Sequence, residues 1–233
     1  MIACGGSEPS RSAAAIAIAG GDQQSAQIST AVANPPSVLV KDESGDPVSG
    51  IRVTFTVASG GGTVQGASAR SGANGIAVVG NWVVGTTTGT NTLNASVAGL
   101  PSVTFTANST PGAPATITAV TPVSQSALAG AAVPVVPAVL VADAFGNGVT
   151  GVVVTFAVTA GSGSITGNPV TTTNNGIATL GSWVLDPSPG PNTLAASVSQ
   201  SGISGSPVLF QATGLTSAYD IDLRFLGSIN SAQ

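Results

Sequence analysis

The sequence predicts an all-β protein built from two β-sandwiches in tandem. The first observation is an internal repeat: residues 36–57, PSVLVKDESGDPVSGIRVTFTV, return as residues 137–158, PAVLVADAFGNGVTGVVVTFAV, so that Asp42 becomes Asp143. The second is that each copy contains about seven short segments rich in Val, Ile, Thr and Phe, separated by turns of Gly, Asn and Pro. A shift that stays constant over some sixty positions indicates duplication of a whole folding unit.

In the first copy, apolar residues alternate with polar ones at a period of two, which is typical of strands with one buried face. We expect strands at residues 14–19, 38–40, 51–58, 63–65, 76–84, 92–97 and 102–107, and a polar turn at residues 20–27. In the segment 76–84 we expect the apolar face to carry Ile76, Val78, Gly80, Trp82 and Val84.

The second copy repeats this order. We expect its strands at residues 115–120, 139–141, 152–158, 177–184, 193–198 and 208–212, with a turn at residues 199–206 that is four residues longer than its counterpart. Residues 12–110 and 115–216 are therefore predicted to be the two domains. Residues 111–114 contain two prolines and predict a short, semi-rigid linker, so that the sandwiches would lie end to end with limited swing.

The composition excludes several classes of function. The chain has no His and one Cys, which removes the usual general base, the nucleophile pairs that depend on His, an internal disulfide and a zinc site made of thiolates. A net charge of −4 with five scattered basic residues gives no footprint for nucleic acid. Since only 6% of the residues are charged, Ser, Thr, Asn and Gly must coat the surface, which suits an extracellular bacterial protein.

Mean hydropathy is +0.44, so a membrane span has to be considered. The most apolar stretch, residues 127–142, is rich in Val and contains Pro134 and Pro137. Because a spanning helix needs about 20 apolar residues, we interpret this stretch as two buried strands.

Three features invite a functional interpretation. Asp42, Glu43 and Asp46 form an acidic cluster that suits a calcium site, but most of it is not repeated in the second copy, so a solvated turn is favoured. Trp82 and Trp183 are candidates for sugar stacking, yet their apolar strand faces favour a core role. The glycines at 60–62 lack the Lys-Ser/Thr of a phosphate loop and predict a connecting loop.

Both ends of the chain differ from the repeats. Met1-Ile2-Ala3-Cys4 resembles the end of a bacterial lipoprotein signal, which predicts Cys4 as a lipid attachment site and residues 1–11 as a tether. The charged and apolar regions that precede such a Cys are missing, so the sequence would be a fragment or begin inside the signal; the alternative is an incidental Cys. Residues 219–225 alternate like a strand, so residues 217–233 are predicted to begin a further, truncated domain.

Several motifs occur twice in the same order: D-x-x-G-x-x-V-x-G-[VI]-x-V-T-F from Asp42, N-G-I-A from Asn74, G-x-W-V from Gly80 and N-T-L-x-A-S-V from Asn91. This combination resembles the bacterial immunoglobulin-like domain group 1, the repeats of invasin- and intimin-type adhesins. The resemblance covers residues 12–215 and implies immunoglobulin-like sandwiches that act as spacer or adhesive modules on the cell surface.

The main hypothesis is a non-enzymatic stalk without a cofactor or catalytic residue, which holds a downstream domain away from the envelope. Its expected partners are a protein or glycan on a host or neighbouring cell, its expected contact with the membrane is the lipid at Cys4, as in an outer-membrane lipoprotein, and we expect a monomer. One alternative is a binding module that uses loops 60–75 and 161–175. Another is an accessory region of a secreted hydrolase, because the tail weakly resembles a segment that precedes zinc metalloprotease-like domains.

Overall fold

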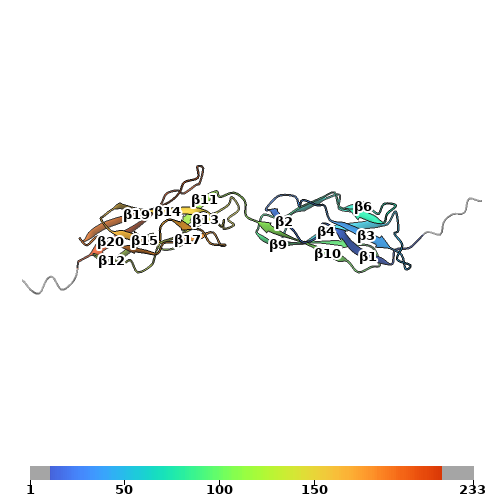
Figure 1. Ribbon diagram of the computed structural model, residues 1–233, viewed down its shortest axis with the longest axis horizontal. Coiled ribbons are helices and arrows are strands. Elements are labelled where there is room, and N and C mark those ends of the chain that lie inside the picture. The colour runs from blue at the N-terminus through green and yellow to red at the C-terminus, as the bar shows by residue number, and fades with distance from the viewer. Residues whose placement is uncertain (1–10, 217–233) are drawn as a thin grey trace, which may run out of the picture. The chain divides into compact units, whose positions relative to one another are not determined.

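The computed structural model describes residues 11–216, and all regular secondary structure in this range is β (Figure 1). The chain divides into two compact units, with the boundary between Pro111 and Gly112. Within residues 11–216 there is no helix of the length and apolar character needed to cross a membrane. The all-β prediction is confirmed, and the apolar stretch at 127–142 forms parts of two strands.

Each unit contains ten strands in the described range. Those of the first unit are β1 (Ala15–Gly20), β2 (Gln24–Gln27), β3 (Ser37–Lys41), β4 (Arg52–Ser59), β5 (Thr63–Gln65), β6 (Ser68–Arg70), β7 (Ile76–Val78), β8 (Asn81–Val83), β9 (Gly89–Ser96) and β10 (Val103–Thr110). Those of the second unit are β11 (Thr116–Ala119), β12 (Ser124–Leu128), β13 (Ala138–Ala142), β14 (Val153–Ala160), β15 (Ser164–Thr166), β16 (Val170–Thr171), β17 (Ile177–Thr179), β18 (Ser182–Val184), β19 (Gly190–Val198) and β20 (Val208–Leu215).

The two units have the same topology. In the first, a five-stranded sheet with the order β2-β10-β9-β4-β6 lies over a three-stranded sheet with the order β1-β3-β7, and β5 pairs with β8. In the second, the orders are β12-β20-β19-β14-β16, β11-β13-β17 and β15-β18. The repeat in the sequence is therefore a repeat of the fold, element by element.

Each unit has its own hydrophobic core, and the two cores share no residue. Among the largest fully buried side chains are a tryptophan, two phenylalanines and a leucine from each unit: Trp82, Phe55, Phe105 and Leu93 in the first, and Trp183, Phe156, Phe210 and Leu194 in the second. Burial of a side chain of this size contributes about 1.5–3 kcal/mol to the stability of the fold. The apolar residues of the alternating pattern thus supply the side chains that pack the two sheets together.

The structure corrects the prediction of a polar turn at residues 20–27. Residues 24–27 form β2, which pairs in parallel with β10. Gly21 and Gln23 have positive φ angles of 79° and 53°, which turn the chain from one sheet to the other. Asp22 fastens this turn because its carboxylate accepts hydrogen bonds from the backbone N–H (2.7 Å) and the hydroxyl (3.0 Å) of Thr106. β2 has no apolar alternation, so the sequence pattern could not indicate it.

The expected single strand at residues 76–84 is also wrong. It divides into β7, which belongs to the three-stranded sheet, and β8, which pairs with β5. The buried positions shift by one residue at the break. Before it Ala77 and Val79 are buried and Val78 is 48% exposed, whereas after it the buried residues of this segment have even numbers. Gly80 lies at the break, where a Cβ would come within 2.9 Å of the Gln65 carbonyl oxygen. Trp82 and Val84 are buried, as expected.

The chain enters and leaves each sandwich at opposite ends. In the first unit, β1 starts opposite Lys41, and the turn after Lys41 leads directly into β4. β4 and β10 run in the same direction because both pair antiparallel with β9. The chain thus enters where β4 begins, which we call the N-terminal pole, and leaves where β4 ends, the C-terminal pole. The second unit has the same arrangement of β11, β14, β19 and β20 (Figure 1).

Candidate functional site: the two poles of each sandwich

An aspartate organises the N-terminal pole of each unit, where β3 or β13 ends. In the second unit this residue is Asp143, which is only 2% exposed. Its Oδ1 accepts hydrogen bonds from the backbone N–H groups of Phe145 (2.9 Å) and Asn147 (3.0 Å). Its Oδ2 accepts from the Asn147 side chain (3.0 Å) and from the backbone N–H of Gly112 (2.9 Å). The carboxylate therefore joins the turn to the linker.

These hydrogen bonds decide the charge state of Asp143. Burial by itself would raise the pKa of this carboxyl, but the hydrogen bonds from Gly112, Asn147 and Phe145 favour the ionised form and lower the pKa below its ordinary value. The side chain is thus a buried anion with four donors. It acts as a structural clamp, since every donor belongs to its own turn or to the linker.

Asp42 occupies the same place in the first unit, with a different partner. Its Oδ1 accepts from the backbone N–H groups of Ser44 and Asp46, both at 3.0 Å. The Arg11 guanidinium, which takes the place of the Gly112 amide, lies 3.6 Å from Asp42 and 3.2 Å from Asp46. In the acidic cluster, Arg11 thus forms ion pairs with two of the three carboxylates, and among residues 11–216 no three acidic side chains are grouped in a way that could hold a metal ion.

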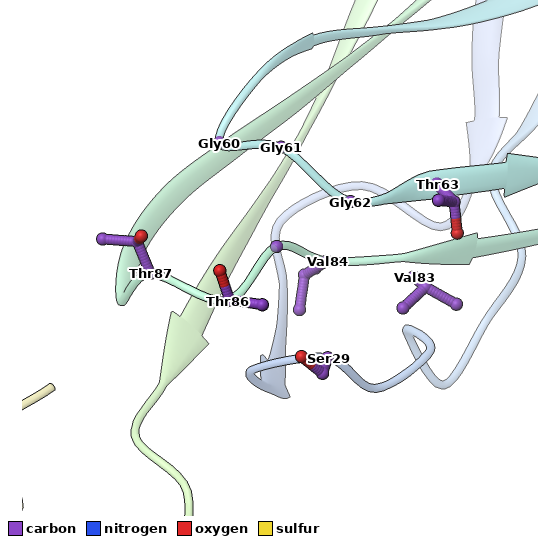
Figure 2. A pocket seen from close by; sticks show the side chains of 10 residues that line it. Ser29, Gly60, Gly61, Gly62, Thr63, Val83, Val84, Thr86 and Thr87 are labelled. Atoms are coloured by element: carbon purple, nitrogen blue, oxygen red, sulfur yellow. The ribbon is translucent and has the colours of Figure 1, made fainter. Parts of the chain in front are cut away.

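The C-terminal pole of the first unit carries an open depression of about 550 Å³. Figure 2 shows the glycines at 60–62 along one side and Thr86 and Thr87 along the other, with Ser29 beneath them. The full lining is Ser29, Gly60, Gly61, Gly62, Thr63, Val83, Val84, Gly85, Thr86 and Thr87. These residues offer hydroxyl and backbone groups to a polar neutral ligand, but none of them is a charged side chain that could transfer a proton.

Asn91 holds this depression together. It is fully buried; its Oδ1 accepts from the Gly85 N–H (3.0 Å) and its Nδ2 donates to the Gly89 carbonyl (3.1 Å) and the Ser109 hydroxyl (3.1 Å). Gly60 is required by close approach, because a Cβ at this position would come within 2.4 Å of Asn91 Oδ1. The repeated N-T-L motif was visible in the sequence, but its function as a buried clamp was not.

The second unit fills the corresponding place with its own carboxylate. Asp186, which replaces Gly85, accepts from the backbone N–H and the hydroxyl of Ser162, both at 2.7 Å. Hydrogen bonds from Ser188 and Ser162 lower the pKa of Asp186. The corresponding place in the second unit therefore carries a carboxylate, and the two predicted binding loops, 60–75 and 161–175, begin in different chemical surroundings.

The two tryptophans are core residues, as predicted. Both side chains are fully buried, and neither indole nitrogen has a hydrogen-bond partner within the described residues. A sugar cannot stack on a ring that has no exposed face. Cys4 and residues 217–233, which carry the predictions of a lipid anchor and a further domain, lie outside the described residues.

Two arginines lie directly opposite each other in the first unit. Arg52 of β4 pairs with Arg70 of β6, and both are exposed. Arg52 donates to the Ser68 hydroxyl (3.2 Å) and Arg70 to the Gly50 carbonyl (2.6 Å), and no ion pair involving either is found within residues 11–216. Directly opposite like charges destabilise a sheet. The second unit has Val153 and Thr171 at these positions.

We therefore expect Arg70→Glu to stabilise the first unit by about 0.5 kcal/mol, because it replaces repulsion by a cross-strand ion pair. Urea unfolding at low ionic strength measures the gain, which should shrink in high salt. Arg70→Thr is the matched control, which removes the repulsion without adding attraction and should give a smaller gain. A loss of stability in Arg70→Glu at low salt would contradict the explanation.

Comparison with known proteins gives no match to a protein-family model and none to a curated sequence. Solved structures do match. InvD of Yersinia pseudotuberculosis aligns with a TM-score of 0.50 at 20% identity, over 82% of this chain and 55% of that chain. The chain is a tandem of two immunoglobulin-like domains. The predicted resemblance to invasin and intimin repeats is thereby confirmed at the level of the fold.

Two further structures match the immunoglobulin-like tandem. They are FdeC, an Escherichia coli adhesin, with a TM-score of 0.47 at 19% identity over 86% of this chain and 64% of that chain, and the D0–D1 domain of intimin, with a TM-score of 0.36 at 21% identity over 88% and 99%. The tandem thus spans less than two thirds of the InvD and FdeC chains. At these identities the comparison describes the fold of the two domains and not their activity.

Proposed function

We propose that this tandem is a non-catalytic spacer of a bacterial surface adhesin. The observation that carries the proposal lies within each domain: the chain enters at the N-terminal pole and leaves at the C-terminal pole. A domain of this kind adds its full length to the reach of the chain. Eight-residue strands such as β4 and β10 correspond to about 26 Å at roughly 3.3 Å per residue, and the turns at both poles add to this length.

Two adjacent residues of the linker, Pro111 and Gly112, are each hydrogen-bonded to the domain that they adjoin. Pro111 is held by the first domain, whose Gln27 side chain donates to the Pro111 carbonyl (3.3 Å). Gly112, the next residue, is held by Asp143 of the second domain (2.9 Å). Each of these residues is thus fastened to its own domain, and Pro111 and Pro114 are the prolines from which the sequence predicts a semi-rigid linker.

We further propose that the spacer is displayed on the cell surface, tethered through a lipid at Cys4, and that it holds whatever follows residue 233 away from the envelope. Its partners would then be proteins or glycans on a host or neighbouring cell. The support is the tandem immunoglobulin-like fold, which the chain shares with InvD, and the poor charge content of a surface coated with Ser, Thr and Asn.

Small-angle scattering on residues 12–216 tests the spacer function. Two domains with radii of gyration of about 13 Å each, held roughly 35 Å apart, should give about 22 Å, whereas one compact globule of this length would give about 17 Å. A variant with a flexible Gly-Ser insertion between Pro111 and Gly112 is the control, and its distance distribution should broaden. A radius near the compact value would remove the proposal.

A second candidate is a loop-mediated binding module, favoured by the depression over residues 60–63 at the C-terminal pole of the first domain. Its neutral lining of glycine and threonine suits a hydroxyl-rich ligand such as a glycan. Binding to a glycan array that vanishes when residues 60–63 are replaced by residues 161–164 would support it, because the second domain fills the same place with Asp186.

A further inference from the structure

The outer edge of the first strand differs between the two domains. In the second domain the long turn after β19 covers the edge of β11. The Ile117 N–H donates to the Ser204 carbonyl, and the Ser204 N–H donates to the Ala115 carbonyl, both at 2.9 Å. Gly205 allows this close approach, since a Cβ there would come within 2.4 Å of the Ile117 carbonyl oxygen. One backbone segment therefore satisfies the edge.

No residue in the described part of the first domain covers β1 in this way. Its corresponding turn is four residues shorter, and among the described residues β1 pairs only with β3. The two isolated bridges of the first domain, Ala31 with Val83 and Lys41 with Pro47, both recur in the second. The bridge between Thr116 and Ser204 has no counterpart in the first. By the repeat, the N–H of Ile16 and the carbonyl of Ala14 correspond to the covered groups and face outward without such a segment.

The uncovered edge is apolar. Residues 12–21 contain no charged residue and no proline, and Ile18 is 39% exposed although its partner in the ladder, Val38, is fully buried. Edge strands are normally protected by charge, proline, a bulge or a covering segment. Here a bulge lies between Ile18 and Gly20, at the C-terminal end of β1, and leaves the preceding residues open.

We propose that this edge pairs with the same edge of a second copy of the chain. Residues 15–19 read Ala-Ile-Ala-Ile-Ala in both directions. Antiparallel pairing about a two-fold axis at Ala17 sets each Ile16 against Ile18 of the second copy. In this register the outward N–H and carbonyl groups of Ile16 and Ile18 form hydrogen-bonded pairs, while Ala17 meets its own equivalent in a non-hydrogen-bonded pair. An identical strand therefore covers the apolar side chains of the edge and pairs with its outward N–H and carbonyl groups.

The pairing joins two three-stranded sheets into one of six strands. The contact is smaller than the roughly 1,200 Å² typical of stable interfaces, so the association is weak, with a dissociation constant on the order of 0.1–1 mM. The chain is then a monomer in dilute solution and associates where it is concentrated, as on a surface. This revises the expectation of a simple monomer and does not depend on the spacer function.

Disulfide trapping in the full chain tests the register. With Cys4→Ser as background, Ala17→Cys should form a disulfide-linked dimer, because the Cα atoms of a non-hydrogen-bonded pair are about 4.5 Å apart, within the range of a disulfide. Thr118→Cys is the matched control, an exposed residue at the same position of the covered strand β11. Trapping of Ala17→Cys should be about ten-fold faster; equal rates would overturn the proposal.

Sedimentation equilibrium up to about 1 mM tests the association without cysteine. Ile18→Lys places a charge on the edge and should weaken association at least about ten-fold. Replacing residues 98–102 by residues 199–207 transplants the covering turn and should abolish it, while circular dichroism shows that both variants remain folded. A chain that stays monomeric at 1 mM, or an association that persists in both variants, would overturn the assignment to β1.

Discussion

Replacement of Trp82 by alanine is expected to lower the free energy of unfolding of the first domain by about 3–5 kcal/mol. The indole of Trp82 is fully buried and belongs to the same core as Phe55, Phe105 and Leu93. The core cannot collapse onto the space without moving strands of both sheets, so much of the cavity will remain. Urea unfolding of the variant followed by circular dichroism measures the loss, while the fluorescence of Trp183 follows the transition of the second domain separately.

The two domains provide the control for this experiment. Because the cores share no residue, Trp82→Ala should leave the unfolding of the second domain unchanged, and Trp183→Ala should do the reverse. Trp82→Phe should cost far less than Trp82→Ala, because it retains an aromatic ring and removes an indole N–H that has no hydrogen-bond partner in the described structure. A loss below about 1 kcal/mol in Trp82→Ala would show that the indole does not fill the core as described.

Asp143→Ala is expected to destabilise the second domain by about 2–3 kcal/mol, because it leaves several donors of the turn and the linker without their acceptor. The effect should depend on pH. The pKa of Asp143 is lower in the folded domain than in the unfolded chain, so the carboxylate stabilises the fold above about pH 4 and this contribution is lost as the pH falls through the folded pKa.

Urea midpoints of the second domain between pH 7 and pH 2 measure this dependence. The urea midpoint of the variant should fall less between pH 7 and pH 2 than that of the parent chain. The difference between the two midpoints should therefore be smallest at the lowest pH. Asp42→Ala is the matched control in the first domain. It should cost less, since Asp42 accepts from two backbone amides where Asp143 has three backbone donors and a side-chain amide. An undiminished difference at low pH would contradict the linkage.

The features that depended on local alternation were predictable. The strands around Phe55, Phe156 and the tryptophans follow a period of two, and the sheets bury the side that the pattern indicated. The failures fall where the chain changes sheet. β2 has no apolar alternation and is held by pairing with β10 and by Asp22, while the break at Gly80 shifts the buried positions by one residue, which places Val78 outside.

The candidate site was predictable only in its residue types. The repeated Asp and Asn were visible as motifs, but a motif does not show which donors surround it. The Gly112 amide donates a hydrogen bond to Asp143 across 31 positions. Asn91 is hydrogen-bonded both to Gly85, which precedes it in the chain, and to Ser109, which follows it. Such contacts are set by the closing of the sandwich and leave no local pattern.

The sequence alone determined that this protein is a duplicated all-β unit without histidine, with two independent tryptophan-centred cores, because hydrophobic burial and strand alternation are local properties of the chain. Only the tertiary structure decided where the chain enters and leaves each domain, how the linker is held, and which strand edge is left open. These depend on pairing between strands that are distant in sequence. Two copies of one motif therefore have the same sheets and differ at one edge: four added residues cover the outer edge of β11, whereas no described residue covers the outer edge of β1.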